Sequence, residues 1–369
     1  MTFNKKVLAG LVAFAAASTS AQAVTVAAND GWELGVSGLI NQFATFTDAK
    51  GADNVANLED GLLPSFLNFD FKAPTMNGLD IAAHISFSPS TSLDSYAAFE
   101  QREVYFTVAG SFGTVLAGKA LGLYSSHNIL TDQTLFGVGY GAGRGAGGEE
   151  TVTTLGGIGL GYDYASWRSQ IKWTSNDMNG FKIALAVMDP SSGIVDLTGV
   201  SGGTSGTLVT GGTASDNFRY EGDLSYAGTF DGGNFTAWLS AMTQDEDNAG
   251  NNDTHAWTVG GTVVVGGFEA MAQYSDAEND DVATETEWDQ FLVQAGYRFA
   301  GTTLVSAQYA ELDTDVKGAA SYDESEKWTI GVYHDVNANL KLVAEYTNVE
   351  NDDLNIDTDI FSLGGFVFF

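Results

Sequence analysis

The strongest constraint on the fold of this chain is an alternation of apolar and polar residues that recurs along it. Between residues 167 and 174, Ile171 and Trp173 fall on one side of an extended chain, while Gln170 and Lys172 fall on the other. The same period of two residues recurs at 218–226, 291–299, 328–332 and 359–369. It is the period of a β-strand with one apolar and one polar face. The chain is therefore predicted to be all-β, either as a soluble sandwich or as a membrane barrel.

The connections between the strands distinguish these two architectures. Seven tight turns alternate along the chain with eight longer polar or acidic loops. Short turns at one end and long loops at the other are typical of an outer-membrane barrel, and this set of connections joins sixteen strands. Residues 24–369 provide about 22 residues for each strand with its connection, which fits membrane-spanning strands of about ten residues. The sequence therefore predicts a transmembrane antiparallel β-barrel of 16 strands, without a second domain.

The N-terminal segment has the features of a secretory signal peptide. Lys5 and Lys6 precede an apolar core at residues 7–17, and Ala21-Gln22-Ala23 has the small residues of a cleavage site. The core is too short for a membrane-spanning helix, and no later segment approaches about eighteen consecutive apolar residues. We expect residues 1–23 to be a signal peptide and residues 24–369 to form the barrel.

Composition excludes several classes of function. The formal net charge of −32 becomes −34 once Lys5 and Lys6 are removed. So acidic a chain lacks the basic surface on which nucleic-acid binding depends, and we expect no nucleic-acid partner. The chain has no cysteine, so it has neither a disulfide framework nor thiol chemistry. Its apolar content of 44% is too high for a disordered protein.

A long glycine-rich segment interrupts the strand pattern. Residues 99–110 and 113–120 read as two strands joined by a tight turn, and residues 121–164 then show no strong helical or strand period. A structureless segment of that length inside a compact domain is expected only where the loop is functional. We therefore expect it to fold inside the barrel.

Three stretches resemble the general porins of bacterial outer membranes. The stretch from Arg102 to Lys119, RxxxFxVAGSFGTVLAGK, resembles the fourth and fifth strands of these porins. SFLNFDFKAPTMNGLDIAAHISF is similar to their second and third strands, and WRSQIKWTSNDMNGFKIALAV to their sixth and seventh. The resemblance implies a homotrimer of sixteen-stranded barrels whose long third extracellular loop, here residues 121–164, folds into the pore. This chain differs from the general porins in two ways. It lacks the loop motif Pro-Glu-Phe-Gly-Gly, and it has Asn68 where those porins have an arginine.

The last strand carries a second resemblance. Residues 359–369 alternate and end in Phe369, as in the recognition signal of bacterial outer-membrane barrel proteins. This resemblance implies that Phe369 is part of the signal that the barrel-assembly machinery binds.

A constriction of this kind works by charge segregation, because basic side chains on the wall and carboxylates on the loop set up a field across the pore. The resemblance assigns to the basic wall Arg102, Lys119 and Lys172. The polar strand faces add Lys72 and Arg168. The candidate loop acids are Asp132, Glu149 and Glu150. Each of these residues could instead be a solvated surface charge, and the facing of Arg102 stays open because Glu103 and Tyr105 could lie on either face.

Other apparent motifs carry no predicted chemistry. Residues 143–148 match G-x-G-x-x-G, but no strand-to-helix context surrounds them, which favours a loop over a dinucleotide site. The four histidines show neither metal-ligand spacing nor a nucleophile partner, so we expect no metal, no cofactor and no catalytic residue. The acidic runs 245–247, 276–281 and 350–353 favour solvated loops, with weak calcium or magnesium bridging to lipopolysaccharide as the alternative.

The sequence thus predicts a non-enzymatic channel of the bacterial outer membrane for passive diffusion of ions and small hydrophilic solutes. The acidic loops at its mouth would enrich cations, which predicts a cation preference. On the second strand, Leu67, Phe69 and Phe71 offer an apolar outward face for trimer contacts.

Two alternative functions remain. A substrate-selective channel would need aromatic side chains along the lumen, for which the scattered candidates are Tyr124, Phe136 and Tyr140. A membrane-embedded hydrolase would need a serine, a histidine and a polar partner on one wall, and His84 and Ser86 share a strand face.

Overall fold

The computed structural model describes residues 24–89, 91, 99–141, 153–190, 217–245, 253–280, 285–316, 324–351 and 355–369. The predicted signal peptide and the candidate acids Glu149 and Glu150 lie outside these ranges. What the sequence predicts for them therefore stays a prediction.

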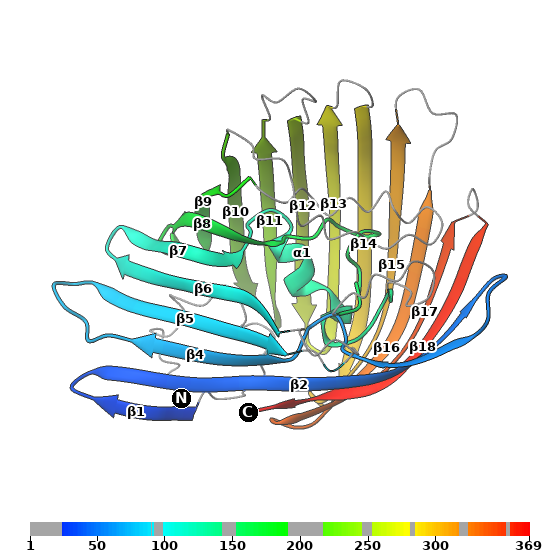
Figure 1. Cartoon of the computed structure of the whole chain (residues 1–369), viewed down its shortest axis with the longest axis horizontal. Coiled ribbons are helices and arrows are strands. Elements are labelled where there is room, and N and C mark those ends of the chain that lie inside the picture. Colours follow the sequence, from blue (N-terminus) through cyan, green and yellow to red (C-terminus); the bar gives the residue numbers. More distant parts are fainter. Residues whose placement is uncertain are drawn as a thin grey trace.

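Sixteen antiparallel strands form a closed barrel (Figure 1). Strands that follow one another pair side by side, and β18 (Ile356–Phe368) pairs with β2 (Trp32–Ala49), which closes the ring. The other barrel strands are β4 (Phe66–Lys72), β5 (Asp80–Pro89), β6 (Phe99–Gly110), β7 (Gly113–Leu121), β8 (Trp167–Thr174), β9 (Phe181–Met188), β10 (Arg219–Phe230), β11 (Gly233–Gln244), β12 (Asp253–Val265), β13 (Phe268–Asp280), β14 (Glu285–Phe299), β15 (Thr303–Val316), β16 (Ser325–Asn337) and β17 (Leu340–Asn351). The predicted fold class and number of barrel strands are confirmed.

Two further short strands lengthen the barrel wall without adding to the ring. Both pair with the long strand β2: β1 (Val24–Asn29) along the edge that β18 also uses, and β3 (Val55–Glu59) along the edge that β4 uses. The end of the chain meets this region, because Phe369 and Gly38 exchange two backbone hydrogen bonds of 2.9 and 2.7 Å. The ring of Phe369 lies over Gly38, where an added Cβ would come within 2.6 Å of it.

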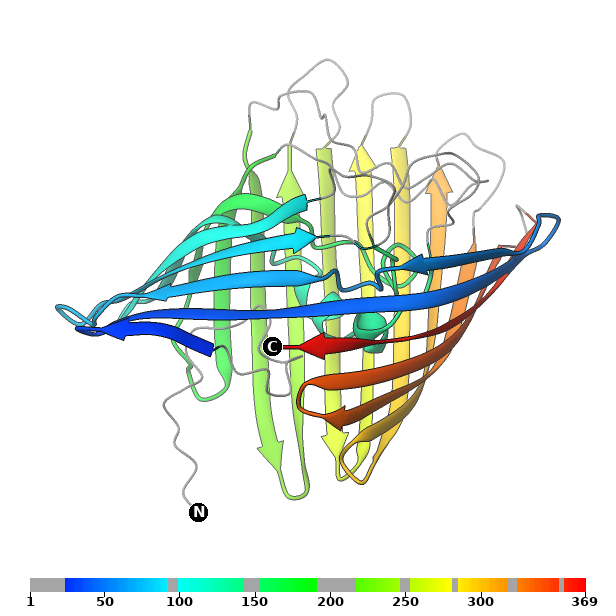
Figure 2. The same cartoon turned by 60° about the horizontal axis from the view of Figure 1, so that its bottom comes forward.

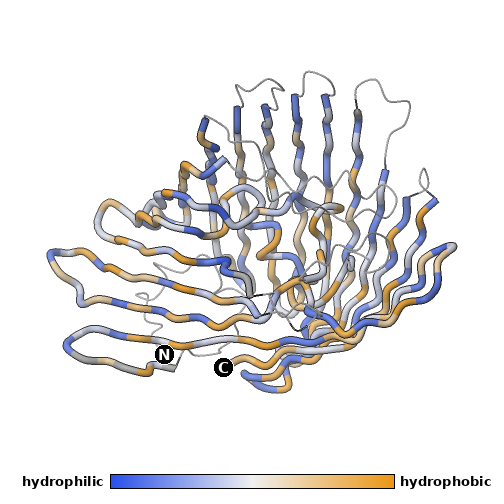
Figure 3. Tube along the Cα trace, in the orientation of Figure 1, coloured by the Kyte–Doolittle hydropathy of each residue, from blue (hydrophilic) through white to orange (hydrophobic). Residues whose placement is uncertain are grey.

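The distribution of apolar side chains is the reverse of that in a soluble sandwich. Along β8, Ile171 is 64% exposed on the outer face, while Gln170 is 5% exposed and faces the lumen. Buried polar side chains such as Thr258 and Thr329 line the inside of other strands. Figure 3 shows the alternation along the strands and the hydrophilic strand ends at the top of the view. An apolar outer band around a polar lumen is the arrangement of a barrel surrounded by lipid.

Two of the short turns share the tripeptide Met-Asn-Gly. Met76-Asn77-Gly78 and Met178-Asn179-Gly180 both place asparagine and glycine in the left-handed region, with φ of 54° and 74° in the first turn and 59° and 95° in the second. Two consecutive residues with positive φ form the type I′ turn that matches the twist of antiparallel strands. These turns fix the registers of the β4–β5 and β8–β9 hairpins.

Helical structure among the described residues is limited to α1 (Ser126–Thr131) and η1 (Gln133–Phe136). Neither of these helices is long and apolar enough to cross a membrane.

Candidate pore constriction

The segment between β7 and β8 folds into the barrel. In two views of the molecule, α1 and the chain that follows it lie inside the ring of strands (Figure 1 and Figure 2). Residues 122–141 and 153–166 of this segment, called here the constriction loop, contact lumenal side chains of the wall from β10 to β17. The prediction that this segment folds into the pore is confirmed for its described residues, 121–141 and 153–164.

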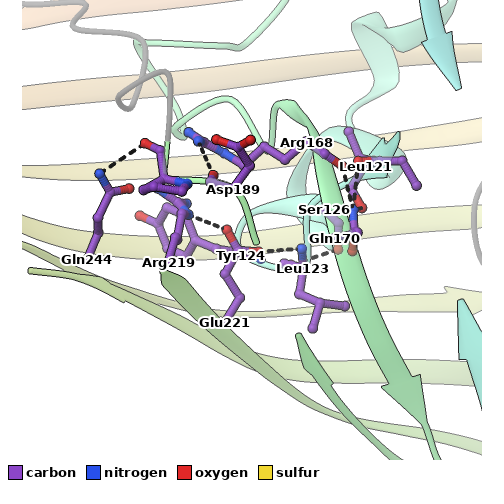
Figure 4. Close-up of polar contacts among 12 residues, drawn as sticks. Leu121, Leu123, Tyr124, Ser126, Arg168, Gln170, Asp189, Arg219, Glu221 and Gln244 are labelled. Atoms are coloured by element: carbon purple, nitrogen blue, oxygen red, sulfur yellow. Dashed lines mark hydrogen bonds and ion pairs between the residues drawn. The ribbon is translucent and has the colours of Figure 1, made fainter. Parts of the chain in front are cut away.

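The start of the constriction loop is held by a buried carboxylate. Glu221 on β10 accepts hydrogen bonds from the backbone amides of Leu123 (2.6 Å) and Tyr124 (2.9 Å), and it pairs with Arg219 at 2.6 Å (Figure 4). The hydroxyl of Tyr124 donates to Asp163 (2.7 Å), which joins the outgoing and returning parts of the loop. Burial raises the pKa of the Asp163 carboxyl, although hydrogen bonds from Tyr124 and Trp288 oppose this.

The helix of the loop is fixed by one asparagine. The side-chain amide of Asn128 donates to Thr258 (3.0 Å) and Gln273 (3.1 Å), while its oxygen accepts from the indole of Trp238 (2.9 Å). His127 stacks on Trp238 with 5.2 Å between ring centroids. Helix α1 is therefore attached to three adjacent strands, β11 to β13.

The predicted loop acid Asp132 does not face the pore. Its carboxylate is 3% exposed and accepts hydrogen bonds from Tyr162 (2.6 Å), Gln308 (2.7 Å) and the amide of Gly157 (3.0 Å). It also caps η1 through the amide of Thr134 (2.8 Å). Burial and the neighbouring Asp132 raise the pKa of the Tyr162 hydroxyl. Asp132 therefore organises the interior of the loop, and its prediction as an acid of the pore surface is wrong.

The far end of the loop is held by two charged residues that the sequence analysis missed. Lys327, which is fully buried, donates to the carbonyl of Gly156 (2.7 Å). Glu345 accepts from the amides of Val138 (2.7 Å) and Gly139 (2.9 Å), and its carboxylate fills the space in which a side chain at Gly137 would lie. The signal that could have found them is the alternation itself, which places both on the lumenal face of β16 and β17.

Three of the predicted wall bases face the lumen. Arg168 and Lys172 share the lumenal face of β8 with Gln170, and Arg168 is 2% exposed. Lys72 is also lumenal, but it lies beside the short turn after β4 and pairs loosely with Glu33 at 3.8 Å.

Lys119 lies on the outer face of the barrel. Its neighbours Gly118 and Ala120 pair with Gln170 and Arg168, whose side chains are lumenal, whereas Lys119 pairs with the exposed Ser169. The prediction of Lys119 as a wall base is wrong, because side chains alternate along β7 and the lumenal positions are 118 and 120.

Arg102 lies at an irregularity of the wall. Between the pairs Ser86–Glu103 and Ser88–Glu100, β6 contains one residue more than β5, and Arg102 falls within this bulge. The lumenal side chain at this level is the carboxylate of Glu103, which is 2% exposed.

Carboxylates and histidines that sequence reasoning missed complete this part of the lumen. Glu103 and Asp70 flank His84 on β4 to β6, and His127 of the loop faces Asp223 of β10 at 3.1 Å. Among the described residues the lumen therefore does not have a basic wall opposite an acidic loop. Acids and bases are interleaved on the wall, and the loop contributes a histidine.

The chain was compared with known proteins. A family model described as Gram-negative porin matches residues 8–354. A comparison with curated proteins finds no match.

Several solved structures share the fold. The anion-selective porin from Comamonas acidovorans is 16% identical, with a TM-score of 0.69, and the alignment covers 92% of this chain and 100% of that one. OmpF of Salmonella typhi is 12% identical, with a TM-score of 0.64 and coverage of 93% and 99%. A trimer form of OmpT of Vibrio cholerae is 14% identical, with a TM-score of 0.57 and coverage of 92% and 100%.

Identities this low support the fold alone, so the assignment to a family rests on the family model. That model spans nearly the whole chain, and the closed barrel with an inward-folded loop agrees with it. The chain belongs to the Gram-negative porin family and is an outer-membrane channel.

Proposed function

We propose that this channel passes ions and small hydrophilic solutes by diffusion and prefers cations. The observation that carries the proposal is the net charge of −34 on residues 24–369. At the constriction, acids and bases nearly balance. The carboxylates of Glu221, Glu103 and Asp223 act on Lys172, while Arg168 shares the lumenal face of β8 with it and Arg219 pairs with Glu221 at 2.6 Å. The charge outside the constriction therefore determines the proposed preference.

The charge of the whole chain acts at the mouths of the pore. A net charge of −34 on residues 24–369 enriches cations near the mouths of the pore over roughly one Debye length, about 10 Å at 0.1 M salt. Screening shortens this range at higher salt, so the preference should fall as salt rises. The anion-selective porin from Comamonas acidovorans shares the fold only, and its selectivity depends on its own side chains.

The reversal potential across a potassium chloride gradient tests this proposal. Lys172→Gln removes one lumenal positive charge, which changes the potential by about 0.4 kcal/mol per unit charge at about 10 Å in a water-like dielectric. This change favours potassium about twofold and disfavours chloride about twofold, so we expect about a fourfold increase in the permeability ratio of potassium to chloride. The matched control is Lys119→Gln, which removes the same charge from the outer face and should leave the ratio unchanged. Anion preference in dilute salt, or equal effects of the two variants, would contradict the proposal.

We also propose that the channel is a homotrimer with lipopolysaccharide around it, assembled by the barrel-assembly machinery. Leu67, Phe69 and Phe71 alternate with lumenal residues on β4, and Phe71 is 41% exposed on the outer face. An apolar strand face of this kind suits contact with another barrel.

The two alternative functions have less support. Tyr124 and Phe136 attach the constriction loop to itself and to the wall, through Asp163 and Phe366 respectively, so they do not form an aromatic track. Both ring nitrogens of His84 face carboxylates, those of Asp70 and Glu103, where a hydrolase would place a serine hydroxyl next to the histidine. We therefore propose that the channel has no catalytic site.

A further inference from the structure

A group of polar atoms without partners lies on the lumenal wall of β4, β5 and β6. The register places Asn68, Ser86 and Glu103 side by side across these strands, with Asp70 and His84 in the adjacent row. The proposed diffusion function uses the charge of Glu103 but assigns no role to the contact between His84 and Glu103, and the sequence analysis expects no metal here.

The orientation of His84 is fixed on three sides. Its Nδ1 lies 2.8 Å from Asp70 Oδ1, and because a carboxylate only accepts, Nδ1 carries the hydrogen. Its ring stacks on Tyr105 with 5.1 Å between centroids and 23° between planes. Its remaining nitrogen, Nε2, points at Glu103 Oε2 at a distance of 3.4 Å. When Nε2 carries no proton, it presents a lone pair to this carboxylate, and a metal ion can then take the place of the proton between the two atoms.

Neighbouring buried polar atoms also have no hydrogen-bond partner. The buried atoms Glu103 Oε1, Ser86 Oγ, Asn68 Oδ1 and His84 Nε2 have no hydrogen-bond partner within the part of the chain that the structure describes. Glu103 is 2% exposed and Ser86 is fully buried. Buried polar atoms without partners are costly, and native proteins normally satisfy them with another protein group, water or an ion.

We propose that His84 Nε2 and Glu103 bind a divalent transition-metal ion on the wall of the pore. A zinc-like ion with bonds of about 2.0–2.2 Å to nitrogen and oxygen holds two such ligands about 3.4 Å apart at a tetrahedral angle, which matches the 3.4 Å between Nε2 and Oε2. The hydrogen bond from Nδ1 to Asp70 is the outer contact that orients metal-binding histidines. An imidazole ligand favours zinc, copper or nickel over magnesium or calcium.

The site has an open side. The Asp70 side chain is 44% exposed and that of His84 is 13% exposed, so an ion in the lumen reaches the imidazole beside Asp70. Two protein ligands leave the other coordination positions to water, which makes the ion exchangeable rather than structural. A dication bound here would occupy the route of permeating cations.

Titration calorimetry with zinc, on the folded full chain in detergent after treatment with a chelator, tests the site without measuring current. We expect one ion per chain, with affinity reduced at least tenfold in His84→Gln and in Glu103→Gln. Asp70→Asn should reduce affinity by about 10- to 100-fold, since it removes an outer contact only. His334→Gln is the matched control, because that histidine contacts Thr303 at 2.8 Å on the outer face and should not alter zinc binding.

Copper in place of zinc gives a second readout that needs no variant to fold. The electron paramagnetic resonance spectrum of bound copper should show coupling to one imidazole nitrogen. Absence of zinc binding at millimolar concentration, or equal binding by wild type and both ligand variants, would overturn the proposal and identify His84 as an ordinary ion-pair partner of its two carboxylates. Because binding is measured directly, this result is independent of whether the pore prefers cations.

Discussion

Gly137→Ala should release residues 137–139 of the constriction loop from Glu345 on the barrel wall. A Cβ at this position would come within 1.8 Å of Glu345 Oε1, so the carboxylate must leave the position from which it accepts the amides of Val138 and Gly139. Each hydrogen bond to a charged acceptor contributes about 1.5–3 kcal/mol, so the loss of two costs about 3–6 kcal/mol. The ratio of attached to detached loop should fall by about two to four powers of ten.

Hydrogen exchange at the amides of residues 138 and 139 measures this release, and it should accelerate by a similar factor. Single-channel recordings should show a noisier open-state current, since this part of the loop would then fluctuate in the lumen. Gly141→Ala is the matched control, because an added Cβ there would meet no atom within 4 Å. Equal exchange rates in the two alanine variants would refute the reasoning.

A double-mutant cycle separates the loss of the hydrogen bonds to Glu345 from other effects of Gly137→Ala. Glu345→Ala removes the same acceptor from the wall without touching the loop, and it should accelerate exchange at residues 138 and 139 as Gly137→Ala does. Gly137→Ala in the Glu345→Ala background should then add little, because both changes remove one shared interaction.

Three more predictions concern assembly and pH. Deletion of Phe369 removes its bonds to Gly38 and should leave unassembled, protease-sensitive chains; normal surface levels would contradict this. Phe69→Glu should give monomers on mild-detergent gels, and unchanged trimers would count against an interface at β4. The raised pKa of Asp163 means that the folded barrel binds its proton more tightly than the unfolded chain does. Stability should therefore fall as pH rises above about 4, until the folded-state pKa is passed, and Asp163→Asn should flatten this slope in thermal unfolding.

The sequence predicts the barrel wall well because lipid outside and water inside impose opposite demands on alternate residues. The prediction weakens where the loop fills the lumen. Phe43 and Leu292 face inward yet are apolar, because the constriction loop packs against them. On β7, Leu116 faces inward and Val115 outward, so both faces are apolar and alternation cannot show the direction of Lys119.

The charged residues of the constriction were harder to predict, because their directions depend on the register of the strands and on the bulge in β6. Arg102 and Glu103 are adjacent in sequence, and the bulge in β6 determines which of the two side chains faces the lumen. The anchoring role of Asp132 depends on Gln308, which is 176 residues away. Patterns within single segments contain no information about such contacts.

The pairing of β2 with β18 has a consequence for biosynthesis. The register joins Leu39 to Phe368, so the first and last strands of the ring meet only when the ribosome has finished nearly the whole chain. A chain truncated by even one strand would expose two unpaired edges to hydrocarbon, where unsatisfied amides are too costly to persist. The ring can therefore close only in chains that contain both β2 and β18, so a chain that ends before β18 cannot form the closed barrel.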